Sequence, residues 1–394
     1  MRSLRAAIPE DAVGVRGKVY SVRGFDHPGG DTFLKMVRGK DATALFETHH
    51  VDIHAAEDAL RRLEVRGEYE EPHGYDFEEY ARLRDLAKRE FFPNRASRRM
   101  KGGEVARMGG VVLLTAAAHV GTLAVRFGTA EWVGMCACAA YLNSVCGGYG
   151  HNAVHRLHPC AVLLDWNGLS CYEWLFEHIQ SHHMYVNTEC DHDSIAMEPF
   201  LRWLPGRKEC VLDAHAAIGK HVVYAIAEVS VAIQGNLVHR TRWRPVWDAD
   251  LPAWMRVAPM VFVVRMLTYV AVRGWAEGAL TALATLGMAG YLFAYLAHLS
   301  HPFGGEGRPS FLRHQLRNTK DMHVGKGVEG DMLLFLDRQT LHHLFPSVDH
   351  TRLTREVRSA LSVGDFMRPR TVGRLNTMVN DALGGGRAPS HSKK

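Results

Sequence analysis

The sequence predicts an α+β domain at the N-terminus followed by an all-α membrane domain with four transmembrane helices. Three observations support this fold class: the first 75 residues are polar and mixed, four long apolar runs follow in two pairs, and histidine motifs stand beside these runs. The chain has 24 histidines in 394 residues, and histidine is the commonest metal ligand. Its 47 basic and 42 acidic residues are interspersed, so we expect no nucleic-acid partner. Metal or haem chemistry at a membrane is the resulting expectation.

The chain is expected to have four regions. Residues 1–80 form the α+β domain, residues 81–107 a charged helix and a basic linker containing RASRRMKGG, and residues 108–365 the membrane domain. Residues 366–394 form a polar tail that we expect to be partly disordered. The seven cysteines include no C-x-x-C pair, which favours a reduced, cytosol-facing protein. The N-terminus lacks the apolar core of a signal peptide, so we expect membrane insertion through internal segments.

Four apolar runs of about 20 residues are each long enough to cross a hydrocarbon core about 30 Å thick. The short joint within each pair predicts an antiparallel hairpin, and the basic stretch before the first pair favours the cytosolic side. Arg126 can reach the interface from the end of its span, whereas Arg265 lies nearer mid-span and is costly there. The alternative is a set of buried helices in a large soluble protein, but the pairing and the edge tryptophans favour a membrane. The four expected spans are residues 109–128, 132–150, 255–272 and 275–299.

Residues 211–240 are apolar in part but interrupted by polar groups. We expect a helix that lies at the membrane interface, adding no crossing to the four. The interrupting residues are Asp213, His215, Lys220, His221 and Glu228.

A histidine pair in the first domain predicts a haem pocket. His27 opens the motif His-Pro-Gly-Gly, whose proline fixes a turn and whose glycines allow close approach of the backbone to a flat cofactor. Two adjacent histidines, His49 and His50, follow about 23 residues later. His27 and one of them can therefore clamp an iron from opposite faces. With VRGKVYSVRGF before it and GKDATALF after it, the stretch resembles the cytochrome b5 family over residues 14–75. The start of the domain is short for that family and lacks the tryptophan often found in the family's first strand.

The resemblance implies heme b with His27 and His50 as axial ligands, because the second ligand of fused members follows the D-A-T segment by nine positions. His49 is the competing residue, and its plain alternative is a surface histidine, just as His27 could simply occupy a turn. Bis-histidine ligation suits electron transfer rather than oxygen binding.

Three further histidine motifs are expected on one side of the membrane. Residues four apart share a helix face, and this spacing recurs in each motif. Neutral imidazoles suit iron, zinc or copper, and seven or eight of them imply two metals. An even number of crossings brings the three motifs to the cytosolic side, and His298 or His301, at the end of the fourth span, is expected to add a ligand. The motif residues are His151 and His155, then His178, His182 and His183, then Gln339, His342 and His343.

These motifs, read as HxxxH, HxxxHH and QxxHH and joined to a cytochrome b5-like domain, resemble membrane fatty-acid desaturases of the front-end class. The resemblance covers most of residues 14–350, and Gln339 marks that class together with its sphingolipid relatives. Two departures concern the position of the reaction more than its type. The first motif has Asn152 where relatives often have aspartate, and the second has three residues, not two, before its histidine pair.

The resemblance implies a cytosolic di-iron cap that uses O2 to place a cis double bond in a lipid or acyl-CoA substrate. Electrons would come from NADH-cytochrome b5 reductase through the cytochrome b5-like domain, at the endoplasmic reticulum membrane, with both domains facing the cytosol. Gln339 is implied as part of the catalytic centre, as a weaker oxygen ligand or the holder of a metal-bound water. Asp191, Asp193 and Asp337 are candidates to orient ligand imidazoles, or are solvated loop acids.

Other functions remain open at this point. A sphingolipid long-chain-base desaturase or a lipid hydroxylase could use the same metal core, since small changes in substrate placement decide the outcome. A non-catalytic membrane haem protein would be expected to have lost a motif, and a zinc transporter would hold its ligands within the spans. Neither pattern is present in the sequence.

Overall fold

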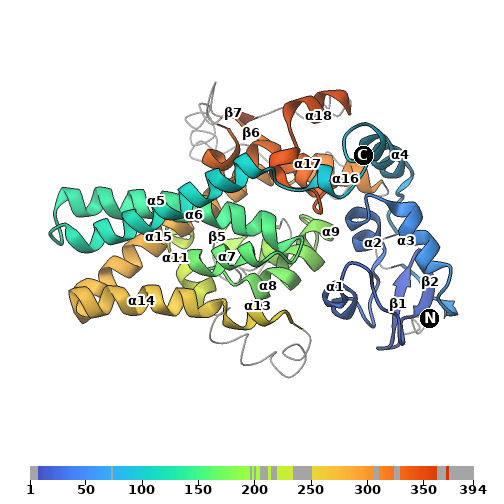
Figure 1. Ribbon diagram of the computed structural model, residues 1–394, viewed down its shortest axis with the longest axis horizontal. Coiled ribbons are helices and arrows are strands. Elements are labelled where there is room, and N and C mark those ends of the chain that lie inside the picture. Colours follow the sequence, from blue (N-terminus) through green and yellow to red (C-terminus); the bar gives the residue numbers. More distant parts are fainter. Residues whose placement is uncertain are drawn as a thin grey trace, which may run out of the picture.

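The structure is a computed structural model with two parts, an α+β domain and a longer helical part (Figure 1). In Figure 1 the α+β domain lies at the right, the long helices project to the left, and a group of short helices lies between them. The described residues are 8–71, 74–195, 198, 201–204, 212–213, 220–233, 251–304, 310–323, 329–361 and 370–371.

The α+β domain is built on a three-stranded antiparallel sheet in the order β1, β2, β3. A two-residue turn, Arg16 and Gly17, joins the first two strands, and both residues have positive φ (50° and 76°). Such turns match the right-handed twist of a hairpin. The elements are β1 Ala12–Val15, β2 Lys18–Ser21, α1 Asp31–Met36, α2 Thr43–His49, α3 Ile53–Leu60 and β3 Val65–Glu68.

The charged helix of the expected linker, α4 (Glu78–Glu90), packs between the two parts of the molecule. Tyr80 is fully buried, and its hydroxyl donates to the Leu344 carbonyl at 2.6 Å. Glu79 pairs with Arg313 at 2.6 Å. A short 3₁₀ turn, η1 (Ala96–Arg98), follows before the first long helix. The helix thus ties the α+β domain to the C-terminal motif region.

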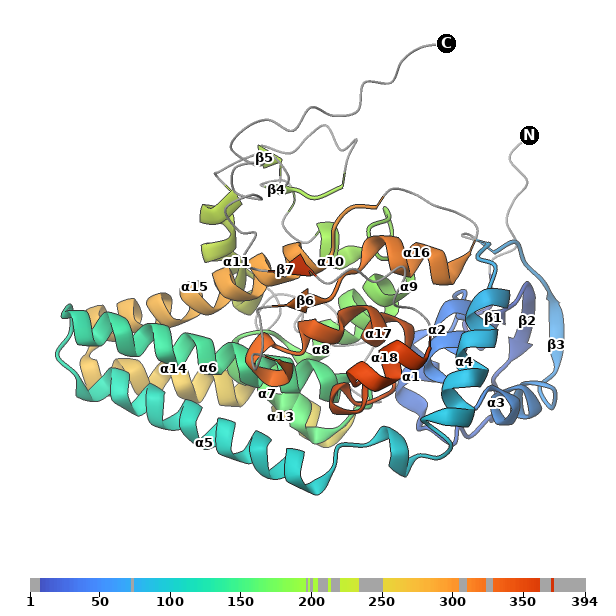
Figure 2. The same cartoon turned by 90° about the horizontal axis from the view of Figure 1, so that it is seen from above.

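Four long helices form two antiparallel hairpins on the left of Figures 1 and 2. The first is α5 (Gly102–Ala124) with α6 (Ala130–Val154), and the second is α14 (Pro259–Arg273), preceded by α13 (Ala253–Val257), with α15 (Trp275–Ser300). Large apolar side chains on α5, α14 and α15 face outward, as Leu113 (72% exposed) and Leu267 (61% exposed) do. Contiguous exposed apolar surface of this kind indicates contact with a membrane.

The prediction of four spans is wrong in one element: within the described residues three helices are long and apolar enough to cross a membrane, at Ala96–Ala124, Ala253–Arg273 and Trp275–Ser300. The expected second span is the helix α6, which has sufficient length but buries polar residues such as Asn143 and Ser144. The C-terminal half of α6 is enclosed by protein, so its composition is that of a core helix. At Gly150 an added Cβ would lie 2.5 Å from the Leu164 nitrogen, which shows how closely α6 and α7 (Val162–Asn167) approach.

The mid-span arginine expected to be costly is buried inside the helical part. Arg265 donates to the Asn143 side-chain oxygen at 2.9 Å, and its guanidinium lies 5.9 Å from the centre of the Trp166 ring. Burial of a charged group requires such polar partners. The structure therefore accommodates Arg265 within α14 without exposing it to lipid.

The expected interfacial segment 211–240 is described only in part. Helix α11 (Lys220–Ile233) packs along α15 and buries Tyr224. His215 and the side chains of Asp213 and Glu228 lie outside the described part of the chain, as does the expected tail 366–394 apart from residues 370–371.

Short elements carry the remaining motifs and lie between the long helices and the α+β domain. They are η2 Pro159–Ala161, α8 Cys171–Trp174, the π-helix η3 Leu175–His182, α9 His183–Tyr185, α10 His192–Ile195, α16 Phe311–Asn318, η5 Gly330–Leu333, η6 Leu336–Arg338, α17 Gln339–Leu344, η7 His350–Arg352 and α18 Arg355–Ala360. Two small parallel strand pairs accompany them, β4 Leu201–Arg202 with β5 Leu212–Asp213 and β6 Met322–His323 with β7 Arg370–Thr371.

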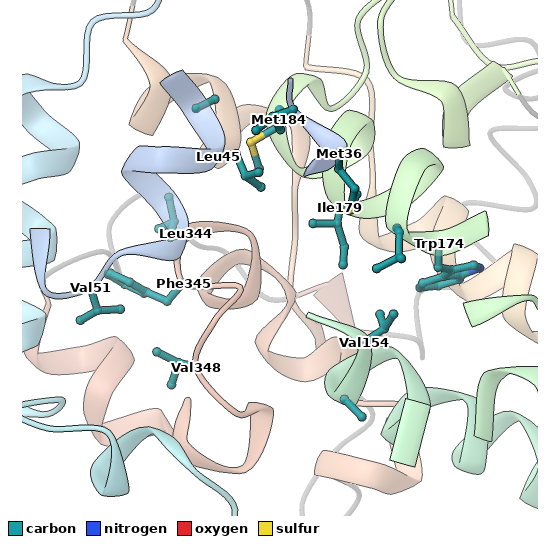
Figure 3. Close-up of a cluster of buried hydrophobic side chains, with 14 of the residues drawn as sticks. Met36, Leu45, Val51, Val154, Trp174, Ile179, Met184, Leu344, Phe345 and Val348 are labelled. Carbon is teal, nitrogen blue, oxygen red and sulfur yellow. The ribbon is translucent and has the colours of Figure 1, made fainter. Parts of the chain in front are cut away.

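One hydrophobic core joins the two parts of the molecule (Figure 3). Met36 and Leu45 of the α+β domain belong to the same buried cluster as Ile179 and Phe345, which stand next to histidine motifs. Gln180 adds a hydrogen bond from its side-chain nitrogen to the Met36 carbonyl at 3.1 Å. The α+β domain is therefore packed directly against the motif region.

Candidate functional site

A cavity of about 520 Å³ is lined mainly by the α+β domain, including residues of α1, α2 and α3. His27 and His50 line it, with ring centres 5.9 Å apart. His27 Nδ1 lies 2.9 Å from the Gly30 carbonyl, and His50 Nδ1 lies 2.9 Å from the Phe46 carbonyl. Because each Nδ1 is held by a carbonyl, each Nε2 is left for a metal.

The glycines after His27 are required by this geometry. A Cβ at Gly29 would lie 2.8 Å from the His27 ring carbon Cε1, and Gly30 has a φ of 92° that favours glycine. The motif therefore serves to place the His27 ring. The apolar lining and the paired imidazoles fit a haem group.

His49 also lines the cavity, next to His50, and its ring approaches the membrane domain. Its Nδ1 is 3.1 Å from the Thr48 hydroxyl, and its Nε2 is buried without a hydrogen-bond partner among the described residues. Its ring centre is 6.2 Å from that of His155. Burial lowers the pKa of His49 to about 3. The structure thus places His50 opposite His27, and His49 beside His155 of the first histidine motif.

The histidine motifs of the membrane domain converge in two adjacent sets. In the first set, one ring nitrogen of each of five buried residues lies within 4.8 Å of all the others. His151 Nε2 is central to it, 2.9 Å from both His178 Nε2 and His342 Nε2. The first set is His151, His155, His178, His183 and His342.

The second set combines His182, His301 and His343, again with ring nitrogens within 4.8 Å of one another. Gln339 joins it, since its side-chain nitrogen is placed 2.9 Å from His301 Nε2 and its side-chain oxygen has no partner in the described part of the molecule. The two sets are neighbours, because the rings of His183 and His343 stack with centres 4.2 Å apart.

The second motif lies in a π-helix, η3, that runs into α9. Hydrogen bonds in a π-helix join residues five apart rather than four, and such turns are frequent at functional sites. His178 and His183, five apart, therefore reach the same point, with their Nε2 atoms 3.0 Å apart, while His182 supplies the second set. The extra residue in this motif is accommodated by the wider turn.

Side chains from other elements orient these rings. Asp193 holds His178 Nδ1 at 2.7 Å, and Asp191 holds His182 Nδ1 at 3.0 Å. Gln315 of α16 lies with its side-chain oxygen 3.0 Å from His343 Nδ1. Contacts of this kind fix the tautomer of a metal ligand. They leave Nε2 of all three rings facing the centre.

Burial keeps His155 and His183 of the first set neutral, whereas His182 of the second set is the exception. Burial lowers the pKa of His155 and of His183 well below the usual range, so both are neutral and able to ligate. At His182 burial opposes protonation, but the Asp191 carboxylate raises the pKa of His182 overall. Burial would raise the pKa of Asp191, but His182 and hydrogen bonds lower it to about 2.

The structure separates some sequence candidates from the two sets. His298 lies with Nδ1 2.6 Å from the Tyr224 hydroxyl and its ring against Trp203, whereas His301 joins the second set. Asp337 contacts Arg338 and no histidine ring among the described residues. In the sequence His298 stands one helical turn before His301, so spacing alone could not show which of the two joins the second set.

Two contributing residues were missed in the sequence. His350 Nε2 lies 2.6 Å from His342 Nδ1, and Gln315 orients His343. Neither residue belongs to a motif with regular spacing. The signal for His350 was limited to its position seven residues after His343.

The donor atoms fit a pair of iron ions. Almost all are imidazole nitrogens, which suit iron, zinc and copper. Several buried nitrogens at the two sets have no hydrogen-bond partner in the described part of the chain, and a bound metal would satisfy them. They include both ring nitrogens of His155 and Nε2 of His343.

A second cavity, of about 170 Å³, adjoins the two sets. His151, His182, His301 and Gln339 line one side of it. The other side is mainly apolar and includes Leu169, Trp174, Phe293, Ala294, Ala297, Leu334 and Leu336. The cavity thus places apolar surface next to the converging imidazoles.

A family model described as "Cytochrome b5-like Heme/Steroid binding domain" matches residues 12–91. The chain is 28% identical over 195 residues to the acyl-lipid (7-3)-desaturase, chloroplastic, of Chlamydomonas reinhardtii, covering 45% of this chain and 37% of that protein. It is 26% identical over 191 residues to acyl-lipid (8-3)-desaturase B of Dictyostelium discoideum, covering 44% and 40%. A cytochrome b5-related protein of Drosophila melanogaster is 25% identical over 345 residues, covering 82% and 75%.

No solved structure matches the chain. The matched stretches span well under half the length of the two desaturases. The chain carries a cytochrome b5-like domain and is homologous to acyl-lipid desaturases, which confirms the resemblance to the cytochrome b5-fused desaturase family.

Proposed function

We propose that the chain is a membrane acyl-lipid desaturase of the front-end class, which inserts a cis double bond into an unsaturated acyl chain with O2 as co-substrate. The observation that carries this proposal is the convergence of three histidine motifs and His301 on two adjacent sets of nitrogens beside an apolar cavity. Two relatives named as acyl-lipid desaturases support the substrate class.

Two iron ions would be held by the two sets, with Gln339 completing the second, and heme b would be held by His27 and His50. Bound iron would supply the activation of O2 and the removal of two hydrogens, and the haem would supply electrons one at a time. Asp191, Asp193 and Gln315 keep Nε2 of their partner rings directed at the metals.

The apolar cavity is the proposed position of the reacting part of the acyl chain. Phe293, Ala294 and Ala297 lie on α15, one of the helices able to cross a membrane, so a lipid can reach the cavity from the bilayer. Apolar walls also keep water away from the reacting methylenes. Gln339 lines the same cavity and is the residue proposed to set the front-end position of the double bond.

Electrons are proposed to enter through the cytochrome b5-like domain. His155, a member of the first set, also lines the haem cavity beside His49, and the two ring centres are 6.2 Å apart. The proposed external donor is NADH-cytochrome b5 reductase, and the proposed location is the endoplasmic reticulum membrane with both domains in the cytosol.

The test is a lipid profile of yeast that express the chain and receive di- and tri-unsaturated C18 to C22 acids. Gas chromatography with mass spectrometry should reveal a new double bond between an existing one and the carboxyl end. The His182→Ala variant is the matched control, because it should lose the product and retain the haem absorbance.

Other products would replace the proposal with a specific alternative. A hydroxylated acid would make the chain a hydroxylase, and a desaturated long-chain base would identify a sphingolipid substrate. A haem-loaded protein with no new lipid on any of these substrates would favour a non-catalytic membrane haem protein.

A further inference from the structure

One wall of the haem cavity comes from outside the cytochrome b5-like match. That match ends at residue 91, yet Arg95, Arg98 and Arg99 of the following segment line the cavity, together with Arg156 and Ser347 of the membrane domain. The facing walls are largely apolar, with Val13, Val15, Phe33, Leu45 and Phe46 among their residues. The cavity therefore combines an apolar interior with a strongly basic wall.

The positive charge of this wall is poorly compensated. Arg95, Arg98 and Arg99 make no ion pair with a described residue, and the acid lining the cavity, Asp52, is bound to Lys88 at 2.5 Å. Arg98 contacts the Asn94 carbonyl at 3.2 Å. Burial lowers the pKa of Arg98, although the Asp52 carboxylate opposes this shift in part, and neighbouring Arg95 adds to it.

Arg156 extends the wall from the membrane domain. Its guanidinium donates to the Asp349 carboxylate at 2.7 Å and to the Asn152 oxygen at 3.0 Å. Asp349 is buried and also accepts from the backbone nitrogen and the side chain of Thr351. Its own backbone nitrogen donates to the Arg98 carbonyl at 2.9 Å, so Asp349 joins the Arg156 side chain to the backbone of Arg98.

Arginine recognises carboxylates through paired, charge-assisted hydrogen bonds. A ligand that matches this cavity is a flat apolar ring system with negative carboxylates at one edge, and heme b has this form. We propose that Arg98 and Arg99, supported by Arg95 and Arg156, bind the two haem carboxylates, so that the haem site is completed by residues beyond the cytochrome b5-like domain. The inference rests on the proposed binding of haem by His27 and His50.

The consequence is a fixed orientation of the haem. Its carboxylate edge would face the segment that precedes α5 and the membrane domain. Haem binding then also stabilises the packing of the α+β domain against the membrane domain, because the ligand contacts residues of both.

The test uses the full-length chain in detergent, loaded either with heme b or with its dimethyl ester, which has no carboxylate charge. The double variant Arg98→Ala/Arg99→Ala is compared with Arg82→Ala/Arg89→Ala, which removes two exposed arginines of α4 that do not line the cavity. Transfer of the pigment to excess apomyoglobin, followed by absorbance, gives the rate of release.

We expect the Arg98/Arg99 variant to release heme b about tenfold faster than the wild type, a loss of ~1.4 kcal/mol. The dimethyl ester should leave both proteins at the same rate, and the α4 control should match the wild type with both pigments. Equal retention of heme b by variant and wild type would overturn the proposal. So would faster release of both pigments, since that result would indicate a general loss of structure.

The haem-release experiment can fail or succeed independently of the proposed desaturase activity. If the wild type binds heme b with the arginine dependence described and makes no new lipid, the proposed activity fails and the carboxylate site stands. If the Arg98/Arg99 variant retains heme b as the wild type does, the proposed carboxylate site is wrong, whatever the lipid profile shows.

Discussion

The haem cavity and the two histidine sets proposed to bind metal, called the metal sets below, both rely on imidazoles, but they orient the rings by different means. In the α+β domain, His27 and His50 each hold Nδ1 against a backbone carbonyl three or four residues away in the sequence. In the membrane domain, His178, His182 and His343 hold Nδ1 against side chains of other segments. A ring fixed by its own backbone needs only local folding, whereas a ring fixed by distant side chains needs the assembled tertiary structure.

Burial separates the two sites as well. His27 is only partly buried, while the described imidazoles of both metal sets are enclosed by protein. An enclosed imidazole without a metal loses hydrogen bonds that water would otherwise supply. The metal sets therefore depend on their ligand more strongly than the haem cavity does, and the following variants test this difference.

The largest effect is expected from removing a ring of the metal sets. His183→Ala deletes a ligand of the first set next to the stacked His343 ring, so iron content and product should fall to background while the haem absorbance persists. Iron analysis and lipid profiles give the measurement. The matched control is His298→Asn, which changes a histidine outside both sets and should keep its iron. Full iron retention by His183→Ala would contradict the assignment of the first set.

Replacing one histidine of the haem cavity should be enough to prevent haem binding. His50→Ala should abolish the haem absorbance, because His50 faces His27 across the cavity. His49→Ala changes the adjacent residue, whose ring lies toward His155, and should retain the haem. Spectra of the two purified variants, with iron content measured in parallel, make the comparison. Loss of haem in His49→Ala and its retention in His50→Ala would reverse the assignment.

An intermediate effect is expected from the side chains that orient the metal ligands. Asp191→Asn keeps the shape of the side chain but removes the charge that holds His182, so metal affinity should fall about 10- to 100-fold. Titration of metal-free protein with Fe²⁺ under anaerobic conditions measures it. Asp337→Asn is the control, because Asp337 contacts Arg338 instead of a ligand ring. An unchanged affinity in Asp191→Asn would mean that the tautomer of His182 is fixed by other contacts.

The haem cavity was more predictable from the sequence than the two histidine sets, because nearby backbone carbonyls orient its rings. The spacing of His27 and His50 and the glycines between them belong to one short segment, and the positive φ of Gly17 and Gly30 follows from the residue type. The three histidine motifs were equally visible as patterns. Their assembly into two sets was not, because the division between His182 and His183 depends on the π-helical turn.

The remaining differences have tertiary causes. Helix α6 was expected to be a lipid-facing span, but its polar residues are buried against other helices, and periodicity cannot distinguish these two environments. His350 and Gln315 reach the metal ligands from segments without a motif. Helix α4 was expected to be part of a linker, and the contacts of Tyr80 and Glu79 with distant segments gave no signal in the sequence.

The smallest effect is expected at the ion pair between Glu79 of α4 and Arg313 of α16. Hydrogen bonds from Arg313 and Ser310 lower the pKa of Glu79 to about 2 from its ordinary value of 4.5. A depressed carboxyl pKa stabilises the fold above pH 4.5, and this contribution is lost as the pH falls toward 2. Glu79→Gln should therefore lower stability by less than about 1 kcal/mol at pH 7, since the pair is partly exposed. At pH 3.5 the difference from the wild type should be smaller.

Thermal unfolding of the detergent-solubilised protein at the two pH values provides the measurement. Glu78→Gln is the matched control, because Glu78 is exposed and, among the described residues, its ion pair is within α4, with Arg82 at 3.4 Å. A pH-independent difference for Glu79→Gln would show that the side chain acts through packing. Because Glu79 links α4 to α16, which carries Gln315, a charge-dependent result would connect α4 through one ion pair to the helix that orients His343.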